Sequence, residues 1–281
     1  MLKILIIGHG FVGKAVDYGF SHPDVIKTIV DPKYGTSLDD FDLMAYDCIF
    51  VCCPTPMGDN GVIDASIISG VCEQLGRVRV TCPVVIKSTV TPDIICSLPV
   101  SSLVYNPEFL TEKSANEQFV DPQFHVLGGS RQATEAVQHL YETYSLCTPC
   151  PTLHMTLEEA SFVKYTINSF LAMKVLFFNQ LYDAVRDTTN ANFATIIKAV
   201  GMDSRIGSSH TKVPGFDGKQ GYGGACFPKD TLAITKYTNK LTLLEKAIII
   251  NNDYRLQYEL DDREKEQNVK YNGQTKEELK D

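Results

Sequence analysis

The chain has 281 residues, of which 44% are hydrophobic, and a formal net charge of −8. This length and apolar content suffice for one large domain or two ordinary ones. The negative charge argues against nucleic-acid binding, which needs a basic surface, but a few local cations could still hold an anionic small substrate. No apolar run approaches the roughly 20 residues of a membrane span, and no signal-peptide layout follows Met1. We therefore expect a cytosolic protein without a membrane partner.

The chain contains nine cysteines at irregular spacings. An odd number without regular spacing does not resemble the disulfide framework of a secreted protein. Cys48, Cys52 and Cys53 lie in or beside an apolar run, and we interpret them as small core residues. Cys147 and Cys150 form a CxxC pair, but no second pair of ligands follows at a suitable spacing, so we expect no metal site.

The first part of the chain, to about residue 145, alternates between short apolar runs and helical stretches. The runs are rich in Val and Ile with little period-2 alternation, which is typical of parallel strands buried on both faces. They are KILIIG, VIKTIVD, DCIFVCC, PVVIKSTV, SLVYNPEF and FHVLGG, and helices are expected at GKAVDYGF and ASIISGVCEQLG. This alternation predicts an α/β fold, a Rossmann-like doubly wound parallel sheet, in residues 1–150.

The pattern changes after about residue 150. Thr156 and Glu159 form a capping-box signature, and no Gly or Pro interrupts the chain from there to about Arg186. The apolar residues of this stretch cover more than one face, so we expect a helix buried on several sides. It would be the long central helix of an all-helical domain in residues 151–260.

The remaining sequence predicts shorter elements. A second helix is expected at NFATIIKAVG, a glycine-rich loop at about residues 207–224, and a last helix from about Thr231 into the 250s. Residues 261–281 are mostly polar and charged, so we expect a loosely ordered tail there.

The sequence GHGFVG follows the first predicted strand and opens a helix, which makes it a dinucleotide-binding signature. Gly8 permits a tight turn, Gly10 lets a pyrophosphate approach a helix N-terminus, and Gly13 allows close packing of helix on strand. Asp31 ends the next strand, where a carboxylate would bind the adenosine ribose and repel a 2′-phosphate. NAD is therefore favoured over NADP, although Lys33 weakens this preference. The alternative is a glycine-rich turn without a ligand.

Three further segments end predicted strands, at the edge where open α/β sheets bind ligands. They are Pro54-Thr55-Pro56, Lys87-Ser88-Thr89-Val90 and Asn106-Pro107-Glu108-Phe109-Leu110-Thr111-Glu112. Taken alone, the first two are more often ordinary loops. Glu108 and Glu112 are candidates for acid–base catalysis, but, taken alone, they are more often surface charges or acids favoured by a helix dipole.

Lys164 and Asn168 stand four residues apart on the predicted long helix and therefore share a face. A lysine at such a position either reaches solvent past its apolar neighbours or faces a polar site. Position alone leaves both possibilities open.

The segment GYGGACFPKD, residues 221–230, is the most informative one. Its three glycines allow a backbone that lies tight against a ligand. They deliver Cys226 next to Lys229 and Asp230, and a nearby cation favours the nucleophilic thiolate. The alternative is a structural cysteine in a tight turn.

These motifs together resemble the UDP-glucose/GDP-mannose dehydrogenase family over nearly the whole chain to about residue 255. In chain order they are GHGFVG with Asp31, PTP, KSTV, NPEFL-x-E, K-x-x-x-N, Arg205-Ile206-Gly207 and GYGGACFPKD. The resemblance implies an NAD-dependent, four-electron oxidation of the C6 alcohol of a nucleotide sugar to a carboxylate. UDP-glucose is the expected substrate and polysaccharide biosynthesis the expected context.

The resemblance also implies roles for single residues. Cys226 would be the nucleophile that holds the C6 carbon as a thiohemiacetal and then as a thioester. Lys164 and Asp230 would steer proton transfer and a catalytic water. Asn168 would help to stabilise the oxyanion, and Glu108 would be the base for thioester hydrolysis.

Further residues would complete the site. Thr89 would position the hydrolytic water, Glu112 would lie between cofactor and substrate, and Lys229 would act electrostatically. Arg205 matches an arginine that reaches the substrate diphosphate of a neighbouring subunit, and we expect a homodimer through the long helix. Cofactor contacts are expected from Gly8, Gly10, Phe11, Val12, Gly13, Asp31, Lys33, Pro54, Thr55, Pro56, Ser88, Thr89 and Glu112. Substrate contacts are expected from Phe109, Leu110, Glu112, Lys164, Asn168, Arg205, Tyr222, Gly223 and Gly224.

The sequence departs from the family pattern in two places. Family members continue into a second Rossmann-like domain that helps to bind the nucleotide, whereas this chain stops, and a separate chain could supply that domain. The stretch from Arg205 to Cys226 is also longer than in the UDP-glucose enzymes. One alternative function is an NAD-binding remnant that serves as a partner subunit. Another is a two-electron 3-hydroxyacid dehydrogenase, against which Cys226 argues because that chemistry needs no thiol.

Overall fold

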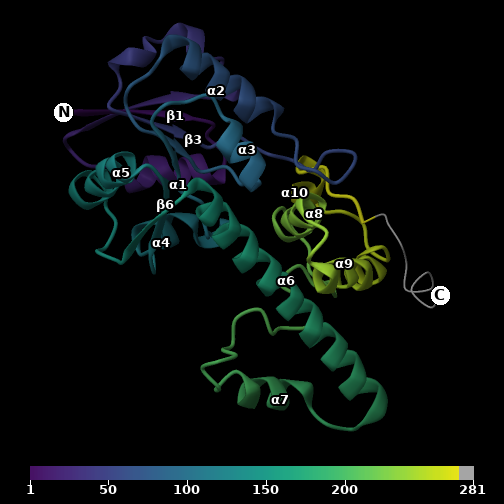
Figure 1. Cartoon of the computed structure of the whole chain (residues 1–281). Coiled ribbons are helices and arrows are strands. Elements are labelled where there is room, and N and C mark those ends of the chain that lie inside the picture. The colour runs from purple at the N-terminus through teal and green to yellow at the C-terminus, as the bar shows by residue number, and fades with distance from the viewer. Residues whose placement is uncertain (272–281) are drawn as a thin grey trace. The chain divides into compact units, whose positions relative to one another are not determined.

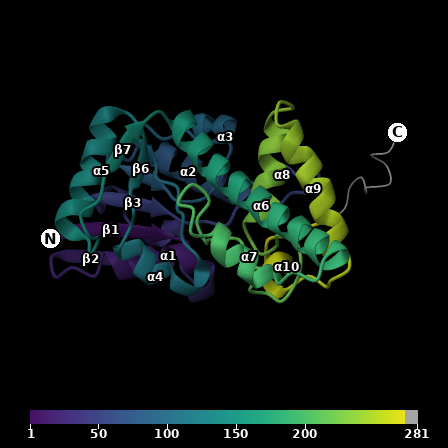
Figure 2. The same cartoon turned by 90° about the horizontal axis from the view of Figure 1, so that it is seen from below.

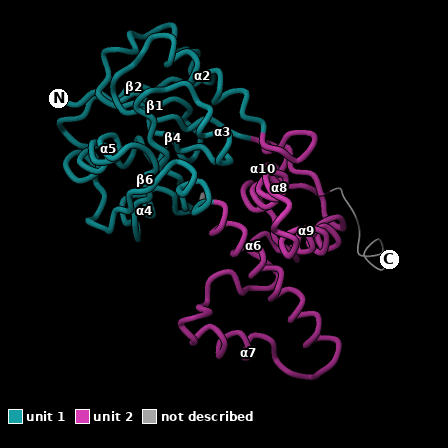
Figure 3. The backbone as a smooth tube through the Cα atoms, in the orientation of Figure 1, with its two compact units in different colours: residues 1–55, 64–164 teal, residues 56–63, 165–281 magenta. Residues whose placement is uncertain are grey.

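The computed structural model describes residues 1–271 (Figure 1). The chain divides into two compact units (Figure 3). Unit 1 comprises Met1–Thr55 and Asp64–Lys164, and unit 2 comprises Pro56–Ile63 and Tyr165–Asp281. The chain thus contributes a short segment to unit 2 before it returns to complete unit 1.

Unit 1 is built on a seven-stranded sheet of order β2-β1-β3-β4-β5-β6-β7. The strands are β1 (Leu2–Ile7), β2 (Val25–Val30), β3 (Cys48–Val51), β4 (Val84–Ile86), β5 (Leu103–Tyr105), β6 (His125–Gly129) and β7 (Thr152–Met155). The order reverses between β2-β1 and β3-β4, so the carboxyl ends of β1 and β3 form the crevice at which such sheets bind ligands. The predicted Rossmann fold and the six predicted strands are confirmed.

The sheet is parallel, as predicted, except at one pair of strands. β5 and β6 run antiparallel, whereas the other neighbouring strands are parallel. The connection between β5 and β6 contains only two short helices and does not return the chain to the edge at which β5 begins. The additional strand β7 lies beyond the boundary that we placed at residue 150.

Helices cover both faces of the sheet in unit 1 (Figures 1 and 2). They are α1 (Phe11–Gly19), α2 (Ser66–Val78), α3 (Pro92–Ser97), α4 (Ala115–Val120) and α5 (Arg131–Tyr144), with 3-10 turns at Pro32–Tyr34, Leu38–Asp40, Leu43–Ala45 and Glu112–Ser114. Ile4 and Ile6 of β1 pack with residues of α1, α4 and α5, while the intervening Leu5 is equally buried. Burial of successive residues explains why these strands lack period-2 alternation. Cys48, Cys52 and Cys53 are buried here, as expected.

Unit 2 is helical apart from its loops. Its helices are α6 (Leu157–Thr188), which begins in unit 1, α7 (Phe193–Val200), α8 (Phe227–Tyr237), α9 (Thr242–Arg255) and α10 (Asp262–Glu266). The predicted capping box is confirmed, because the backbone N–H of Glu159 and that of Thr156 each bond to the other residue's side chain. Among residues 1–271, no helix is both long and apolar enough to cross a membrane.

Two expectations about the C-terminal part are wrong. The single last helix is two helices, because Thr238 has an extended backbone and ends α8. Residues 261–271 do not form a loosely ordered tail, since they contain α10 and the buried side chains of Glu264, Val269 and Tyr271. The charges of this stretch find partners distant in the sequence, which a local pattern does not reveal. The rest of the predicted tail, residues 272–281, lies outside the described residues.

Candidate active site

The glycine turn between β1 and α1 has the shape that a dinucleotide site requires. A Cβ on Gly8 would lie 2.7 Å from Cys52 O, and one on Gly13 would lie 2.0 Å from Gly8 O, so packing demands both glycines. Gly10, the N-cap of α1, has no atom within 4 Å of a Cβ position. Open space at a helix N-terminus fits a pyrophosphate.

Asp31 lies at the end of β2, as expected, and is bonded to this turn. Its carboxylate accepts hydrogen bonds from the backbone N–H groups of His9, at 2.6 Å, and Lys33, at 3.0 Å. Burial raises the pKa of Asp31, but these two hydrogen bonds and the Lys33 charge outweigh it, and the pKa is lowered overall. Asp31 is therefore a carboxylate at neutral pH and also supports the backbone of the turn.

A cleft of about 470 Å³ opens beside this turn in unit 1. Its lining includes Lys14, Lys33 and Lys113, together with His9 and Gly10. The three ammonium groups make the cleft a suitable surface for phosphates. Sequence reasoning did not find Lys14 and Lys113, because a single lysine on an exposed helix or turn carries no signal.

The two strand-end segments after β3 and β4 are joined by hydrogen bonds. The Ser88 hydroxyl donates to Cys53 O at 2.6 Å, and the Thr55 hydroxyl donates to Thr89 O at 2.9 Å. Phe11 and Val12 begin α1 at the same edge of the sheet, whereas Pro56 begins the segment that belongs to unit 2.

Glu108 and Lys164 form a buried pair in unit 1. Lys164 Nζ lies 3.2 Å from Glu108 Oε1 and donates to Glu108 O at 2.5 Å. The backbone N–H of Leu110 donates to the other carboxylate oxygen at 2.7 Å, and the Phe109 ring lies 5.4 Å from Lys164 Nζ. Lys164 therefore faces a polar site and not solvent. The side chain of Glu112 lies outside what the structure describes.

A cavity of about 320 Å³ adjoins this pair, lined by Glu108, Phe109 and Leu110 and also by Lys87. Lys87 is buried, and its Nζ donates to Asn106 Oδ1 at 2.8 Å. Burial lowers the pKa of Lys87 to about 8. Sequence reasoning did not identify Lys87 as a site residue. It could have done so, because a lysine at the end of a continuous apolar strand is buried and needs a polar partner.

In unit 2, Cys226 is the N-cap of α8, and the first turn of this helix contains the buried polar residues Lys229 and Asp230. The backbone N–H of Asp230 donates to Cys226 O at 2.8 Å. The Asp230 carboxylate contacts Lys229 Nζ at 2.5 Å and accepts from Asn168 Nδ2 at 2.6 Å. The structure therefore brings three of the predicted residues, Asn168, Lys229 and Asp230, into one cluster.

Two of the three glycines before Cys226 face side chains of the protein itself. A Cβ on Gly221 would lie 2.7 Å from Asn251 Oδ1, and one on Gly223 would lie 2.3 Å from Arg255 Nη2. These two glycines thus accommodate the protein's own side chains, whereas at Gly224 (φ +79) the Cβ position is open.

Two predicted substrate residues have contrasting surroundings in unit 2. Tyr222 is buried, with its hydroxyl 3.5 Å from Thr231 Oγ1. The side chain of Arg205 is 87% exposed and pairs with Asp203 at 2.6 Å. Arg205 thus lies on the surface, where a neighbouring molecule can reach it.

Comparison with known proteins relates both parts of the chain to one family. Residues 33–145 match the NAD binding domain of the UDP-glucose/GDP-mannose dehydrogenase family, and residues 158–253 match its central domain. The chain belongs to this family. The resemblance stated from the motifs is confirmed, and the cofactor of the first domain is NAD.

Curated relatives of the UDP-glucose/GDP-mannose dehydrogenase family are similar over much of this chain. UDP-glucose 6-dehydrogenase of Rickettsia typhi is 30% identical over 78% of this chain and 52% of its own length. UDP-glucose 6-dehydrogenase TuaD of Bacillus subtilis is 29% identical over 91% of this chain and 64% of its own. The chain spans about half the length of the first of these relatives.

Solved structures agree with the family assignment. A UDP-glucose dehydrogenase from Pyrobaculum islandicum has a TM-score of 0.77 and 28% identity, covering 90% of this chain and 68% of that one. A 3-hydroxyisobutyrate dehydrogenase from Mycobacterium tuberculosis has a TM-score of 0.67 at 14% identity, covering 88% of this chain and 91% of that one. The second similarity shows only that the fold is shared.

Proposed function

We propose that the chain is an NAD-dependent nucleotide-sugar 6-dehydrogenase that oxidises the C6 alcohol to a carboxylate. UDP-glucose is the first candidate substrate, since relatives bear the name UDP-glucose 6-dehydrogenase. The observation that carries the proposal is Cys226 at the N-terminus of α8, with the buried cluster of Asp230, Lys229 and Asn168 in unit 2. A two-electron dehydrogenase has no use for a thiol in such surroundings.

NAD fits the turn between β1 and α1 because Gly10 leaves room for the pyrophosphate and Asp31 presents a carboxylate. When bound, NAD accepts a hydride in each oxidation. The residues proposed to hold it are Gly8, Gly10, Phe11, Val12, Gly13, Asp31, Lys33, Pro54, Thr55, Pro56, Ser88, Thr89 and Glu112.

Cys226 is proposed as the nucleophile. The positive end of the α8 dipole favours an anionic thiolate over a thiol at this position. Addition of Sγ to a C6 aldehyde forms a thiohemiacetal, whose oxidation leaves a thioester. Water then breaks the C–S bond, which releases the carboxylate and restores the thiol. The covalent bond retains the aldehyde between the two oxidations.

The buried polar groups are proposed to handle protons and charge. Glu108 would activate the hydrolytic water, with Thr89 positioning it, and Lys164 would hold the carboxylate of Glu108 in place. Asn168 would stabilise the oxyanion, while Asp230, held by Lys229, would guide a proton or water. Substrate contacts are proposed for Phe109, Leu110, Glu112, Lys164, Asn168, Tyr222, Gly223 and Gly224, and for Arg205 toward a neighbouring subunit.

A second candidate function is an NAD-binding partner subunit without catalysis of its own. Such a function would need only the cofactor turn, which lies entirely in unit 1, and not the Cys226 loop of unit 2. NAD binding without oxidation of any sugar nucleotide distinguishes this case from catalysis.

The proposal is tested by incubating the purified chain with NAD and, in turn, UDP-glucose, GDP-mannose and UDP-N-acetyl sugars. We expect two NADH per sugar with the true substrate, because four electrons are removed, whereas a 3-hydroxyacid dehydrogenase type of reaction would yield one. With Glu108→Gln, Cys226 can still attack while water activation is slowed. An acyl adduct on Cys226 should therefore accumulate in intact-protein mass spectra.

Cys226→Ala is the decisive control for the thiol. If the wild-type chain turns over and Cys226→Ala keeps the full NADH yield and rate, the thiol is structural and the assignment is wrong. If NAD binds but no sugar nucleotide is oxidised, the partner-subunit function is supported instead.

A further inference from the structure

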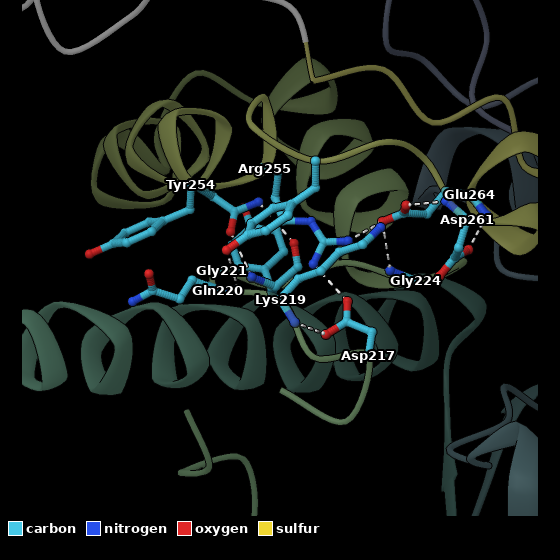
Figure 4. Close-up of polar contacts among 12 residues, drawn as sticks. Asp217, Lys219, Gln220, Gly221, Gly224, Tyr254, Arg255, Asp261 and Glu264 are labelled. Atoms are coloured by element: carbon cyan, nitrogen blue, oxygen red, sulfur yellow. Dashed lines mark hydrogen bonds and ion pairs between the residues drawn. The ribbon is translucent and has the colours of Figure 1, made fainter. Parts of the chain in front are cut away.

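A buried ion network supports the loop that carries Cys226, within unit 2 (Figure 4). Its centre is Arg255, the last residue of α9, which is 1% exposed. One guanidinium nitrogen contacts Asp217 Oδ2 at 2.7 Å, and another contacts Glu264 Oε1 at 2.7 Å. The fork of the guanidinium thus bridges two carboxylates that lie 47 positions apart in the sequence.

Glu264 connects this network to the loop backbone. Besides Arg255, its Oε1 accepts the Tyr271 hydroxyl at 2.6 Å and the backbone N–H of Gly224 at 3.1 Å. Its Oε2 accepts from the backbone N–H of Asp261 at 2.9 Å. Glu264 is fully buried, so its position is determined by all four donors. Gly224, the donor from the loop, precedes Cys226 by only two residues.

The shape of the loop matches the network. A Cβ on Gly223 would lie 2.3 Å from Arg255 Nη2 and 2.7 Å from Glu264 Oε1, so only glycine fits there. The backbone N–H and C=O of Tyr222 are both bonded to the Asn251 side chain, at 2.7 and 3.0 Å. The loop is therefore held on one side, while the Cβ position of Gly224 remains open.

We propose that Glu264 and Arg255 are positioning residues for Cys226, because they fix the backbone from Gly221 to Gly224 that delivers the thiol to the N-terminus of α8. This inference rests on the proposed role of Cys226 as the nucleophile. Glu264 and Arg255 act through the loop and do not touch reacting atoms. Both follow residue 253, where the match to the family's central domain ends.

The first test is Glu264→Gln, which keeps the shape of the side chain but removes the charge that holds Arg255. The nucleophile should be misplaced, so kcat should fall by about tenfold or more. KM for NAD should stay within about twofold, since the proposed cofactor turn is in unit 1. The matched control is Arg263→Gln on the same short helix, whose side chain is 44% exposed, and it should retain kcat.

The second test separates positioning from stability. In the double variant Arg255→Met with Glu264→Leu, apolar side chains replace the ion pair, and such a replacement generally preserves folding. We expect the melting temperature of the double variant to lie closer to that of the wild type than the melting temperature of Glu264→Gln does. Its kcat should stay low, because Gly224 has lost its acceptor. Recovery of kcat together with the melting temperature would overturn the proposal.

A third measurement does not depend on turnover. Iodoacetamide alkylation is followed by peptide mass spectrometry for Cys226, with the exposed Cys96 as the internal reference. In Glu264→Gln and in the double variant, the ratio of the two rates should change by at least about threefold, because thiol reactivity depends on surroundings and access. An unchanged ratio overturns the proposal. The two proposals can fail separately. If the ratio changes but the wild-type chain oxidises no sugar nucleotide, the positioning role is supported and the proposed function fails.

Discussion

Among single residues, Lys87 shows how burial in unit 1 sets the properties of a charged group. Its ammonium lies at the carboxyl end of β4, where it donates to Asn106 Oδ1, and the Tyr141 hydroxyl donates to the same oxygen at 2.7 Å. Desolvation of the cation lowers its pKa to about 8, although the charge of Glu108 acts in the opposite direction. The neutral form of Lys87 is therefore populated in the folded chain at mildly alkaline pH.

This shift predicts a pH dependence of stability that Lys87→Met removes. Between about pH 8 and pH 10.5 the unfolded chain binds the Lys87 proton more tightly than the folded chain does. The free energy of unfolding of the wild type should therefore rise with pH across this window relative to Lys87→Met, by about 3 kcal/mol at most. Denaturant titrations at several pH values measure this difference.

The comparison with the variant is essential, because burial also raises the pKa values of Cys48 and Cys53. Deprotonation of these two thiols lowers the free energy of unfolding as the pH rises, which opposes the effect of Lys87. Both cysteines are present in each chain, so their contribution cancels in the difference. A difference that stays flat between pH 8 and pH 10.5 would contradict a perturbed Lys87.

Among the elements, α6 exposes large aromatic side chains that nothing in the described chain covers. Ala172, Leu176 and Phe178 are buried, whereas Phe170 and Phe177 are 62% and 61% exposed. These two phenylalanines are seven residues apart and therefore lie on the same face of the helix. Exposed aromatic residues on one helical face are typical of a surface that another molecule covers.

We predict a homodimer through this face of α6, as expected from the sequence. Replacement of both Phe170 and Phe177 by Glu should convert the dimer to a monomer, because charges would be buried at its centre. Sedimentation velocity at micromolar concentration measures the change. The control is Phe216→Glu, at a loop residue that is 86% exposed and lies outside α6. A wild-type chain that sediments as a monomer would contradict the prediction.

For the whole molecule, the division into two units separates the turn proposed to bind NAD from the loop proposed to carry the nucleophile. GHGFVG and Asp31 belong to unit 1, and GYGGACFPKD belongs to unit 2. The chain links the units through α6 and through the segment Pro56–Ile63, in which Met57 N donates to Gln267 O at 2.9 Å inside unit 2. Ligand binding to one unit can therefore be measured separately from the other.

We expect NAD to protect unit 1 selectively. At a concentration 100 times its Kd, NAD should stabilise the folded unit by about 2.7 kcal/mol, and hydrogen exchange should slow in the turn after β1. NADP should protect less, because the Asp31 carboxylate repels a 2′-phosphate. Asp31→Asn is the suitable control, since Asn can keep an acceptor for the His9 N–H while losing the charge. Equal protection by NADP in the wild-type chain would refute the role of Asp31.

The amino-acid sequence by itself determined the Rossmann fold, six of the seven strands, the long helix and the family. These features carry local signals, since the GHGFVG motif, the capping box at Thr156 and the GYGGAC motif are each recognised from residues close together in the chain. The site roles assigned from the motifs stay predictions, although the structure brings Lys164 to Glu108 and Asn168 to Asp230.

Tertiary structure alone decided features that depend on partners far apart in the sequence. The direction of β6, the burial of Lys87 beside Asn106 and the order of residues 261–271 all belong to this group. Glu264 looked like one charge among many in a polar stretch, yet it is fully buried because Arg255, Tyr271 and Gly224 converge on it. A local pattern reports the polarity of a side chain, but only the fold determines whether its charge meets water or a buried partner.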